Sequence, residues 1–329
     1  MLKYSLKRIL YSTIILFFVM FIIYILMYNM PSGYIETKAR ELASRPGASK
    51  SYAEWLADLN AQYGMDQGVV RGYLTWLKSA LSGNWGDSWA WTIPVTKEFH
   101  NTVWYSFILG LVSFILEILI AIPLGITAAR KQYSFTDYFT TVVSMICISM
   151  PTFFLATILK YIFSVKLGWF DLSGMQGRNY MNLSDFGKFL DVAKHFVLPA
   201  ITLTVISIGS LMRYTRTNML EVLNADYIRT ARAKGVPEKK VINHHAFRNT
   251  LIPLVTTLGG SLPSLFGGAL ITETLFSIRG IGYASYTSMT QGDIPFIMFY
   301  LAFISILTLL GNLISDLLYA VVDPRVRLS

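Results

Sequence analysis

Six long apolar segments, separated by polar stretches, dominate the pattern of this chain. The first, Ile9–Met30, contains no charged residue. At about 1.5 Å of rise per residue it is long enough to cross the roughly 30 Å hydrocarbon core of a bilayer. The other apolar segments are Thr102–Ala129, Tyr138–Val165, Phe196–Met212, Leu251–Ile271 and Ile294–Val322. The pattern predicts an all-α integral membrane protein with six transmembrane helices.

The first apolar segment has an alternative interpretation as a cleaved signal peptide. A signal peptide would have a shorter apolar region, of about 7–15 residues, before a small-residue cleavage site. The sequence Pro31-Ser32-Gly33-Tyr34 fits such a site poorly. We therefore expect residues 1–30 to hold a cytoplasmic N-terminus and a retained first helix. In the third segment, Met150-Pro151 predicts a kink that neighbouring helices would tolerate.

Residues 31–101 form the longest hydrophilic segment, and we expect an extracytoplasmic cap between the first and second transmembrane helices. Its amphipathic stretches Tyr52–Tyr63 and Val69–Leu81 predict two helices. Six of the seven tryptophans lie between Trp55 and Trp104. Indole rings favour membrane interfaces, so the cap either anchors at the interface or offers a docking surface for an extracellular binding protein. The remaining residues, 102–329, are predicted to form a five-helix core.

The composition supports a membrane protein. Of the 329 residues, 53% are hydrophobic and 14% are charged, whereas a soluble domain carries about 25% charged residues. The net charge of +9 does not indicate a nucleic-acid partner, because the basic residues cluster in the loops between apolar segments. More than half of the 28 Lys and Arg residues lie in segments on the same predicted side of the membrane as the N-terminus. Short positive loops favour the cytoplasm, so both termini are predicted to be cytoplasmic.

Candidate chemistry is sparse. No glycine-rich phosphate loop ending in Gly-Lys-Ser/Thr is present, so an ATP site is not expected in this chain. Cys147 is the only cysteine, which excludes an internal disulfide. His244 and His245 are adjacent and would point to different faces of a helix, so they make a poor metal pair. We expect no catalytic, cofactor or metal site and no enzyme activity.

The polar stretch before the fifth apolar segment carries the sharpest local signals. Asn224 or Asp226 is suited to cap a helix start, and residues 227 to 234 favour a helix. Gly235 follows where a left-handed residue commonly ends a helix. Pro237 suits the first turn of a second helix. The prediction is a short helix, a glycine corner and a second short helix, all outside the membrane.

From residue 227 the sequence reads Tyr-Ile-Arg-Thr-Ala-Arg-Ala-Lys-Gly, followed by His245-Ala246, Arg248-Asn249 and Pro253. This segment resembles the cytoplasmic coupling loop of ABC importer permeases, in the branch that serves dipeptides, oligopeptides and nickel. The general motif begins Glu-Ala-Ala where this chain has Arg-Thr-Ala, a departure usual in the peptide branch. The resemblance implies that the loop 213–250 docks on an ATP-hydrolysing subunit; the alternative is an ordinary basic loop. The implied contact residues are Asp226, Tyr227, Arg229, Thr230, Ala231, Arg232, Ala233, Lys234, Gly235 and Pro237.

Two later segments resemble the same branch. They are Glu273–Ser277 followed by Gly280-Ile281-Gly282, and Asn312–Arg325. Arg279 stands where the family usually has proline, so this loop is expected to differ in shape. Most of residues 80–327 is covered by these matches, which imply the type I ABC importer permease fold.

The resemblance also implies partners. The chain would form half of a pore with a second homologous permease subunit, above two ATP-binding subunits and below an extracytoplasmic substrate-binding protein. ATP and magnesium would belong to the ATP-binding subunits, with no cofactor in this chain. The complex would work by alternating access in a bacterial or archaeal cell membrane, with the lipid bilayer around it and no nucleic acid.

The solute is open at this point. Peptides are the expected solute, whereas relatives in the same branch carry oligosaccharides or nickel chelates. A secondary transporter is the alternative from another class, but it would usually show an internal repeat, and none is visible between the two halves. A membrane scaffold would not need the helix–glycine–helix loop.

Glu117 stands out near the middle of the second apolar segment. An ionised acid there costs about 2.5–3.5 kcal/mol on insertion scales. Lys160 is the obvious partner, yet the two differ in predicted depth by about 15 Å. Three hypotheses remain. Glu117 is a neutral acid bonded to a neighbouring helix, a partner of the second permease, or a carboxylate on the translocation path that meets the cationic end of a passing peptide.

Overall fold

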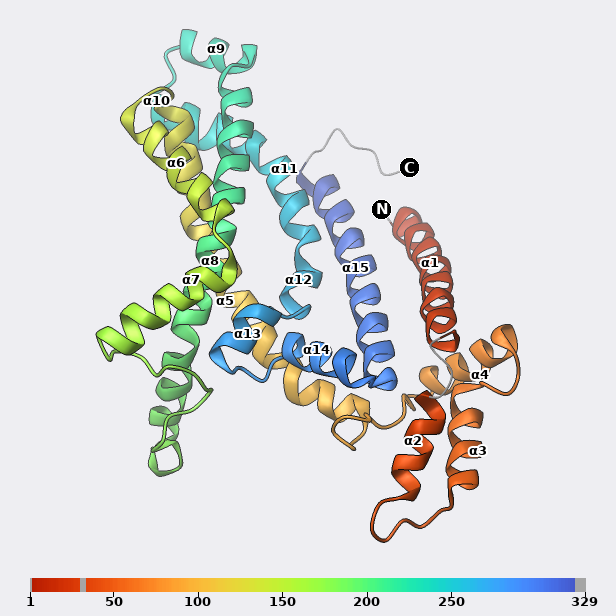
Figure 1. Cartoon of the computed structure of the whole chain (residues 1–329). Helices are drawn as coiled ribbons and strands as arrows, with labels where there is room; N and C mark the ends of the chain where they lie inside the picture. Colours follow the sequence, from red (N-terminus) through yellow and green to blue (C-terminus); the bar gives the residue numbers. More distant parts are fainter. Residues whose placement is uncertain (1, 30–33, 323–329) are drawn as a thin grey trace. The chain divides into compact units, whose positions relative to one another are not determined.

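The computed structural model describes residues 2–29 and 34–322 (Figure 1). The sequence segments Pro31-Ser32-Gly33 and Asp323-Pro324-Arg325 therefore lie outside the described residues. The chain divides into two compact units. One unit comprises Val103–Tyr283 with the segment from Leu310, and the other comprises Leu2–Thr102 with Ala284–Leu309. Among the described residues, the only extended pairing is an isolated bridge between Asp87 and Pro94, so the prediction of an all-α protein is confirmed.

Within the described ranges, four helices are long and apolar enough to cross a membrane. They are α1 (Leu2–Tyr28), α5 (Val95–Arg130), α8 (Asp185–Leu223) and α15 (Ile294–Val322). Two bent helix pairs pass the same test and bring the number of candidate spans to six.

The first bent pair joins α6 (Phe135–Ser149) to α7 (Thr152–Leu159), which continues into the π-helix η1 (Lys160–Lys166). The two arms meet at 102°. Pro151 stands immediately before α7 and has no N–H to continue the preceding helix, so the predicted kink is confirmed. The second pair, bent by 44°, runs through α11 (Phe247–Gly260) and α12 (Leu262–Phe266) to α13 (Leu270–Phe276).

Several helices extend beyond the apolar segments that predicted them. Helix α8 begins at Asp185, inside the polar stretch 166–195 between the third and fourth apolar segments, and the Ser184 Oγ accepts from the Gly187 N–H at its start (3.3 Å). A short 3-10 turn, η2 (Tyr180–Asn182), precedes it. Helix α14 (Ile281–Gln291) occupies much of the stretch between the fifth and sixth apolar segments. Apolar runs mark only the part suited to hydrocarbon, whereas capped helices continue into polar surroundings.

The unit that contains the cap region holds three further helices. They are α2 (Tyr34–Ala43), α3 (Tyr52–Tyr63) and α4 (Val69–Leu81). The last two have the bounds expected from their amphipathic pattern. Ser51 and Glu54 form a capping box that starts α3, and Gly64 ends it at φ 65°. Capping and the left-handed glycine explain why a polar segment folds here.

Aromatic residues of α1 and α4 build the core of this unit. Tyr24, Tyr73 and Trp76 are buried and lie within ring-contact distance of one another. The Tyr24 hydroxyl donates to the carbonyl of Tyr63 (2.7 Å), so its polar end is satisfied in the apolar interior. Trp76, one of the tryptophans of the predicted cap, is part of this core.

Asp293, at the start of α15, organises the segment between α4 and α5. Its fully buried carboxylate accepts from the Ser88 hydroxyl (2.5 Å) and from the backbone N–H groups of Trp89 (3.0 Å) and Ala90 (3.2 Å). Three donors on one carboxylate fix the loop 87–92 in place, since each charge-assisted hydrogen bond is stronger than a neutral one.

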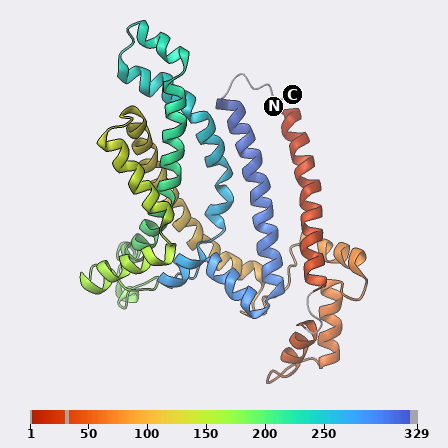
Figure 2. The same cartoon turned by 45° about the horizontal axis from the view of Figure 1, so that its top comes forward.

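In the other unit, α6 and α8 run side by side (Figure 2). A bidentate ion pair joins them: Arg216 donates from Nε to Asp137 Oδ1 (2.6 Å) and from Nη2 to Oδ2 (2.8 Å). The Asp137 side chain is only 3% exposed. Removing one partner of such a pair typically costs about 3–5 kcal/mol, because the other charge stays buried alone. The pair therefore fixes the register of the two helices.

Candidate functional site

The loop after α8 folds as a helix, a glycine corner and a second helix. Helix α9 (Asp226–Ala233) ends before Gly235, which adopts φ +74°, and Pro237 precedes the short helix α10 (Glu238–Lys240). The Val236 N–H donates back to the carbonyl of Ala231 (3.2 Å) and closes the corner. The predicted first helix and glycine corner are confirmed, whereas the second helix is not short, because α10 continues without a break into the helical residues 241–260.

The predicted cap of α9 is wrong. Ala225 precedes the helix and no side chain caps it; Asp226 is the first residue of α9. Asn224 ends α8 instead, and its Nδ2 donates to the carbonyl of Leu220 (3.0 Å). The cause is the length of α8, which runs to Leu223 and uses Asn224 at its own C-terminus before α9 begins.

Helix α9 is held by one buried face. Ile228 is fully buried in an apolar cluster with Ala129 of α5, Met219 of α8 and the buried residues of the π-helix η3 (Val241–Ala246), which are Val241, Ile242 and Ala246. Ala231 is half-buried and packs against the same cluster. This apolar anchor connects the loop to the long helices α5 and α8 directly.

The opposite face of the loop is open. Nine of the ten predicted contact residues are exposed, and Ala231 is the exception. The exposed residues are Asp226, Tyr227, Arg229, Thr230, Arg232, Ala233, Lys234, Gly235 and Pro237. The loop thus presents a basic outer surface on a rigid apolar base.

Arg232 and Glu238 form a second brace across the corner. The Arg232 guanidinium donates from Nε (3.1 Å) and Nη2 (2.9 Å) to the carboxylate of Glu238. These hydrogen bonds lower the pKa of Glu238 below its ordinary value and raise the pKa of Arg232. Both side chains are more than 40% exposed, so the pair contributes little stability, about 0–1 kcal/mol. Its effect is on the charge of the surface. The Glu238 carboxylate offsets the charge of Arg232, so lysine side chains supply most of the remaining positive charge.

A second feature of the same unit is a pocket between α5, α8 and α12, which we call the Glu117 pocket. Its volume is about 240 Å³. Four serines, one glutamate and two glycines line it together with four apolar residues. The lining residues are Ser106, Gly110, Ser113, Phe114, Glu117, Leu203, Ser207, Ser264, Leu265, Gly268 and Ala269.

Glu117 is half-buried and lines this pocket. Within residues 2–29 and 34–322, its carboxylate makes no hydrogen bond or ion pair, and no neighbouring helix of this chain bonds to it. Lys160 is engaged elsewhere: its Nζ donates to the carbonyl of Leu275 (2.5 Å) and lies over the ring of Phe276. A cation there caps the negative end of α13.

Glu273 is a buried residue to which the sequence analysis gave no role in the site. It is fully buried, and its Oε1 accepts from the Ser106 hydroxyl (2.6 Å) and the Ala269 N–H (2.9 Å). Its Oε2 accepts from the Tyr283 N–H (2.8 Å). The Ser106 Oγ in turn accepts from the Ile281 N–H (2.7 Å). Because Ser106 and Ala269 also line the Glu117 pocket, this network fixes one wall of it.

Two glycines leave the space that the Glu273 carboxylate and the start of α14 occupy. A Cβ on Gly280 would stand 2.6 Å from the Glu273 carboxyl carbon, and a Cβ on Gly282 would stand 2.8 Å from the Leu270 nitrogen. Neither contact is sterically allowed, so Gly280-Ile281-Gly282 lets α14 start against the carboxylate. In the sequence, the signal that could have pointed to this network is a glutamate followed seven residues later by Gly-x-Gly.

Arg279 stands where the resemblance led us to expect a proline, and the structure shows a use for its backbone N–H. The Arg279 N–H donates to the Sδ of Met175 (3.3 Å). A proline has no N–H and could not make this bond. The loop between α13 and α14 is therefore tied to the segment before α8.

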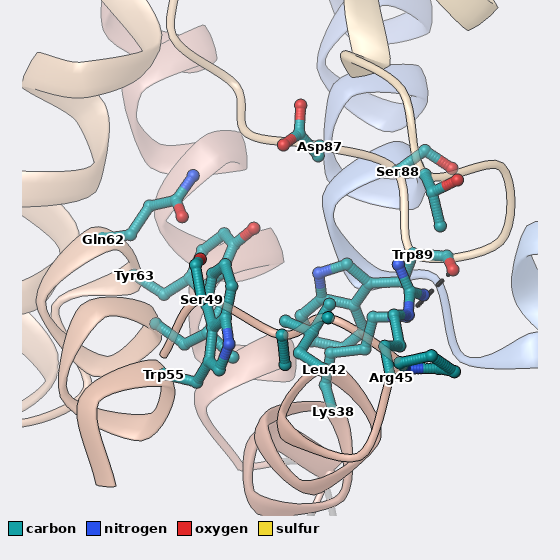
Figure 3. A pocket seen from close by; sticks show the side chains of 15 residues that line it. Lys38, Leu42, Arg45, Ser49, Trp55, Gln62, Tyr63, Asp87, Ser88 and Trp89 are labelled. Carbon is teal, nitrogen blue, oxygen red and sulfur yellow. Dashed lines mark hydrogen bonds between the residues drawn. The ribbon is translucent and has the colours of Figure 1, made fainter. Parts of the chain in front are cut away.

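In the other unit, the cap region encloses a cavity of about 400 Å³ (Figure 3). Its walls carry Trp55, Tyr63 and Trp89 beside two cations. Both cations are already paired. The Lys38 Nζ donates to Glu41 (2.8 Å) and to the carbonyl of Trp89 (2.9 Å), and Arg45 donates to Glu41 (2.6 Å). These bonds make the cavity wall rigid.

Comparison with known proteins decides the family. Residues 121–328 match the sequence profile of the binding-protein-dependent transport system inner membrane component. The chain belongs to this family. The match covers the loop around α9 and six of the eleven residues that line the Glu117 pocket, and it begins four residues after Glu117 itself. The protein is thus a multi-pass membrane permease with the type I ABC permease fold.

Named relatives agree with this assignment. The permease is 40% identical over 267 residues to the oligopeptide transport system permease protein AppB of Bacillus subtilis, covering 81% of this chain and 83% of the relative. It is 32% identical over 340 residues to the dipeptide transport system permease protein DppB of Alkalihalophilus pseudofirmus, covering 99% and 100%. It is 34% identical over 287 residues to the DppB of Escherichia coli K12, covering 82% and 85%.

A second profile, described as ion transport protein, matches residues 1–129. That match covers less than half of the chain and stops before α9. The relatives above extend through the same region, so it does not change the family of the permease.

Proposed function

We propose that this permease forms half of the translocation path of an ATP-driven importer for di- or oligopeptides. The observation that carries the proposal is the loop at α9, with an exposed basic face on a buried anchor that reaches two long helices. Family membership supplies the binding-protein-dependent transport system. The relatives named as oligopeptide and dipeptide permeases support peptides as the solute, ahead of oligosaccharides or nickel chelates.

The proposed partners follow from the same family. A second homologous permease would complete the pore, two ATP-binding subunits with ATP and magnesium would lie against the exposed face of α9, and an extracytoplasmic binding protein would deliver the solute. The excess of basic residues at the N-terminus and in the loop 213–250 supports cytoplasmic termini. On this arrangement residues 31–101 form the extracytoplasmic cap and residues 102–329 the core.

The anchor of α9 suggests how ATPase motion reaches the path. Ile228 packs with Ala129 near the end of α5 and with Met219 near the end of α8. A displacement of α9 must move these helix ends, because a close-packed core transmits displacement rather than absorbing it. Glu117 lies on the same α5, about three turns from Ala129. Rocking of α5 and α8 would then alternate the access of the pocket between the two sides.

The test is reconstitution. We expect the purified permease alone to hydrolyse no ATP, because it carries no phosphate-binding loop. Vesicles that contain the complete complex should import a labelled peptide when ATP and the binding protein are both supplied, and import of oligosaccharide or nickel chelate should be absent. Peptide import that persists without ATP and follows an ion gradient would overturn the proposal in favour of a secondary transporter.

A further inference from the structure

Glu117 is an acid in a membrane-spanning helix without a partner in the part of the chain that the structure describes. Ionisable residues at such positions are costly, and they generally face a partner or a wet path. Lys160, the partner considered from the sequence, donates to the carbonyl of Leu275 at the end of α13 instead. The carboxylate is half-buried and lines a pocket of about 240 Å³, so it is open to a ligand.

The surroundings of Glu117 supply acceptors rather than cations. Ser113, Ser207 and Ser264 line the same pocket, from three different helices. The hydroxyls of Ser113 and Ser264 donate to backbone carbonyls, which leaves their oxygens free to accept. Among the residues that the structure describes, no lysine, arginine or histidine lines the pocket. Serine oxygens from three helices in the same pocket as one carboxylate fit a ligand that carries several N–H donors and a positive charge.

The pocket is also fixed in shape. Glu273 holds the backbone at Ala269 and the side chain of Ser106, both of which line the pocket. Gly110 lies so close to α12 that an added Cβ would meet the Leu265 carbonyl at 3.0 Å. Preorganised walls lower the cost of binding, because little has to be ordered when the ligand arrives.

We propose that the Glu117 pocket binds the N-terminal α-ammonium group of the transported peptide. The ammonium donates to the Glu117 carboxylate and to serine oxygens. The pocket is smaller than the roughly 300–1,000 Å³ of typical whole-ligand sites, so it holds one end of a peptide and leaves the side chains outside. Peptides of different sequence have the N-terminal ammonium group in common, so recognition of this group suits a path that carries peptides of varied sequence. This inference rests on the proposed function.

The experiment places a reporter in the pocket of the complete complex. Ser207→Cys is made in a Cys147→Ala background, because Cys147 is the only native cysteine. Two thiol reagents of similar size, one cationic and one anionic, are applied to nucleotide-free and ATP-trapped complexes. We expect the cationic reagent to react about tenfold faster, as a nearby carboxylate in a low-dielectric site attracts it, and Glu117→Gln to bring the ratio close to one. Asp185→Asn, an exposed carboxylate outside the pocket, is the matched control and should leave the ratio unchanged.

Peptide protection then tests the ligand. A short peptide amide with a free N-terminus should slow labelling of Ser207→Cys at about tenfold lower concentration than its N-acetylated counterpart, and Glu117→Gln should remove this difference. Equal protection by both peptides, or no labelling in either nucleotide state, would overturn the inference. A complex that imports peptide normally but gives that result refutes the ammonium site alone, whereas a complex that imports no peptide refutes the proposed function.

Discussion

Gly235→Val is expected to abolish transport while the permease still inserts and folds. Gly235 adopts φ +74°, a conformation that costs a residue with a Cβ about 1–2 kcal/mol and a β-branched residue more. An added Cβ would have no atom within 4 Å, so the cost is purely conformational. We expect the corner between α9 and α10 to open and the exposed face to lose its shape. Peptide import and co-purification of the ATP-binding subunit should both be lost.

Matched variants separate the effect of backbone conformation from the effect of side-chain size at this corner. Gly235→Asn should retain most of the import, since asparagine tolerates the left-handed region better than other residues. Ala233→Glu should weaken docking from the exposed face without touching the anchor. Ala231→Glu is a poorer probe, because Ala231 packs on the apolar cluster and its substitution would disturb the anchor itself. Normal import by a correctly assembled Gly235→Val complex would refute the role of the corner.

The second large effect is expected at Glu273. Glu273→Ala removes the acceptor of three donors: the Ser106 hydroxyl and the N–H groups of Ala269 and Tyr283. Each buried donor left without an acceptor costs about 1–3 kcal/mol. We therefore expect a loss of about 3 kcal/mol or more in the free energy of unfolding of this unit. Thermal unfolding of the purified permease in detergent or nanodiscs measures the loss.

Glu273→Gln is the control for this prediction. Glutamine keeps one carbonyl acceptor but turns its amide donors toward another N–H. The free energy of unfolding of Glu273→Gln should therefore lie between that of the parent and that of Glu273→Ala. Import should decline in the same order, because the network holds a wall of the Glu117 pocket. An unfolding temperature of Glu273→Ala equal to that of the parent would show that the network adds no stability.

Local signals predicted local structure well. The amphipathic stretches of the cap became α3 and α4, and Gly235 and Pro237 formed the expected corner. These features depend on residues that are neighbours in sequence. The bounds of α8 were missed because its polar ends lack the apolar signal, and the cap of α9 was misassigned for the same reason.

The contacts that build the candidate site could not be predicted in this way. Glu273 meets Ser106 across 167 positions of sequence, and Arg216 meets Asp137 across 79. A single sequence shows the charges but not which of them come together. Glu117 was visible as an unusual acid, yet its pocket depends on residues of α5, α8 and α12 whose packing is a property of the fold.

The most direct test of the central claim is a cross-link from α9. A photoreactive thiol reagent attached at Ala233→Cys, in the Cys147→Ala background, should capture an ATP-binding subunit in the assembled complex. Asp185→Cys at the other end of α8, a 39-residue helix and thus about 58 Å long, is the control and should not capture it. A cross-link from position 233 alone is the predicted result. Equal capture from both positions, or none from position 233 in a complex that hydrolyses ATP, would contradict the assignment of α9 as the coupling helix.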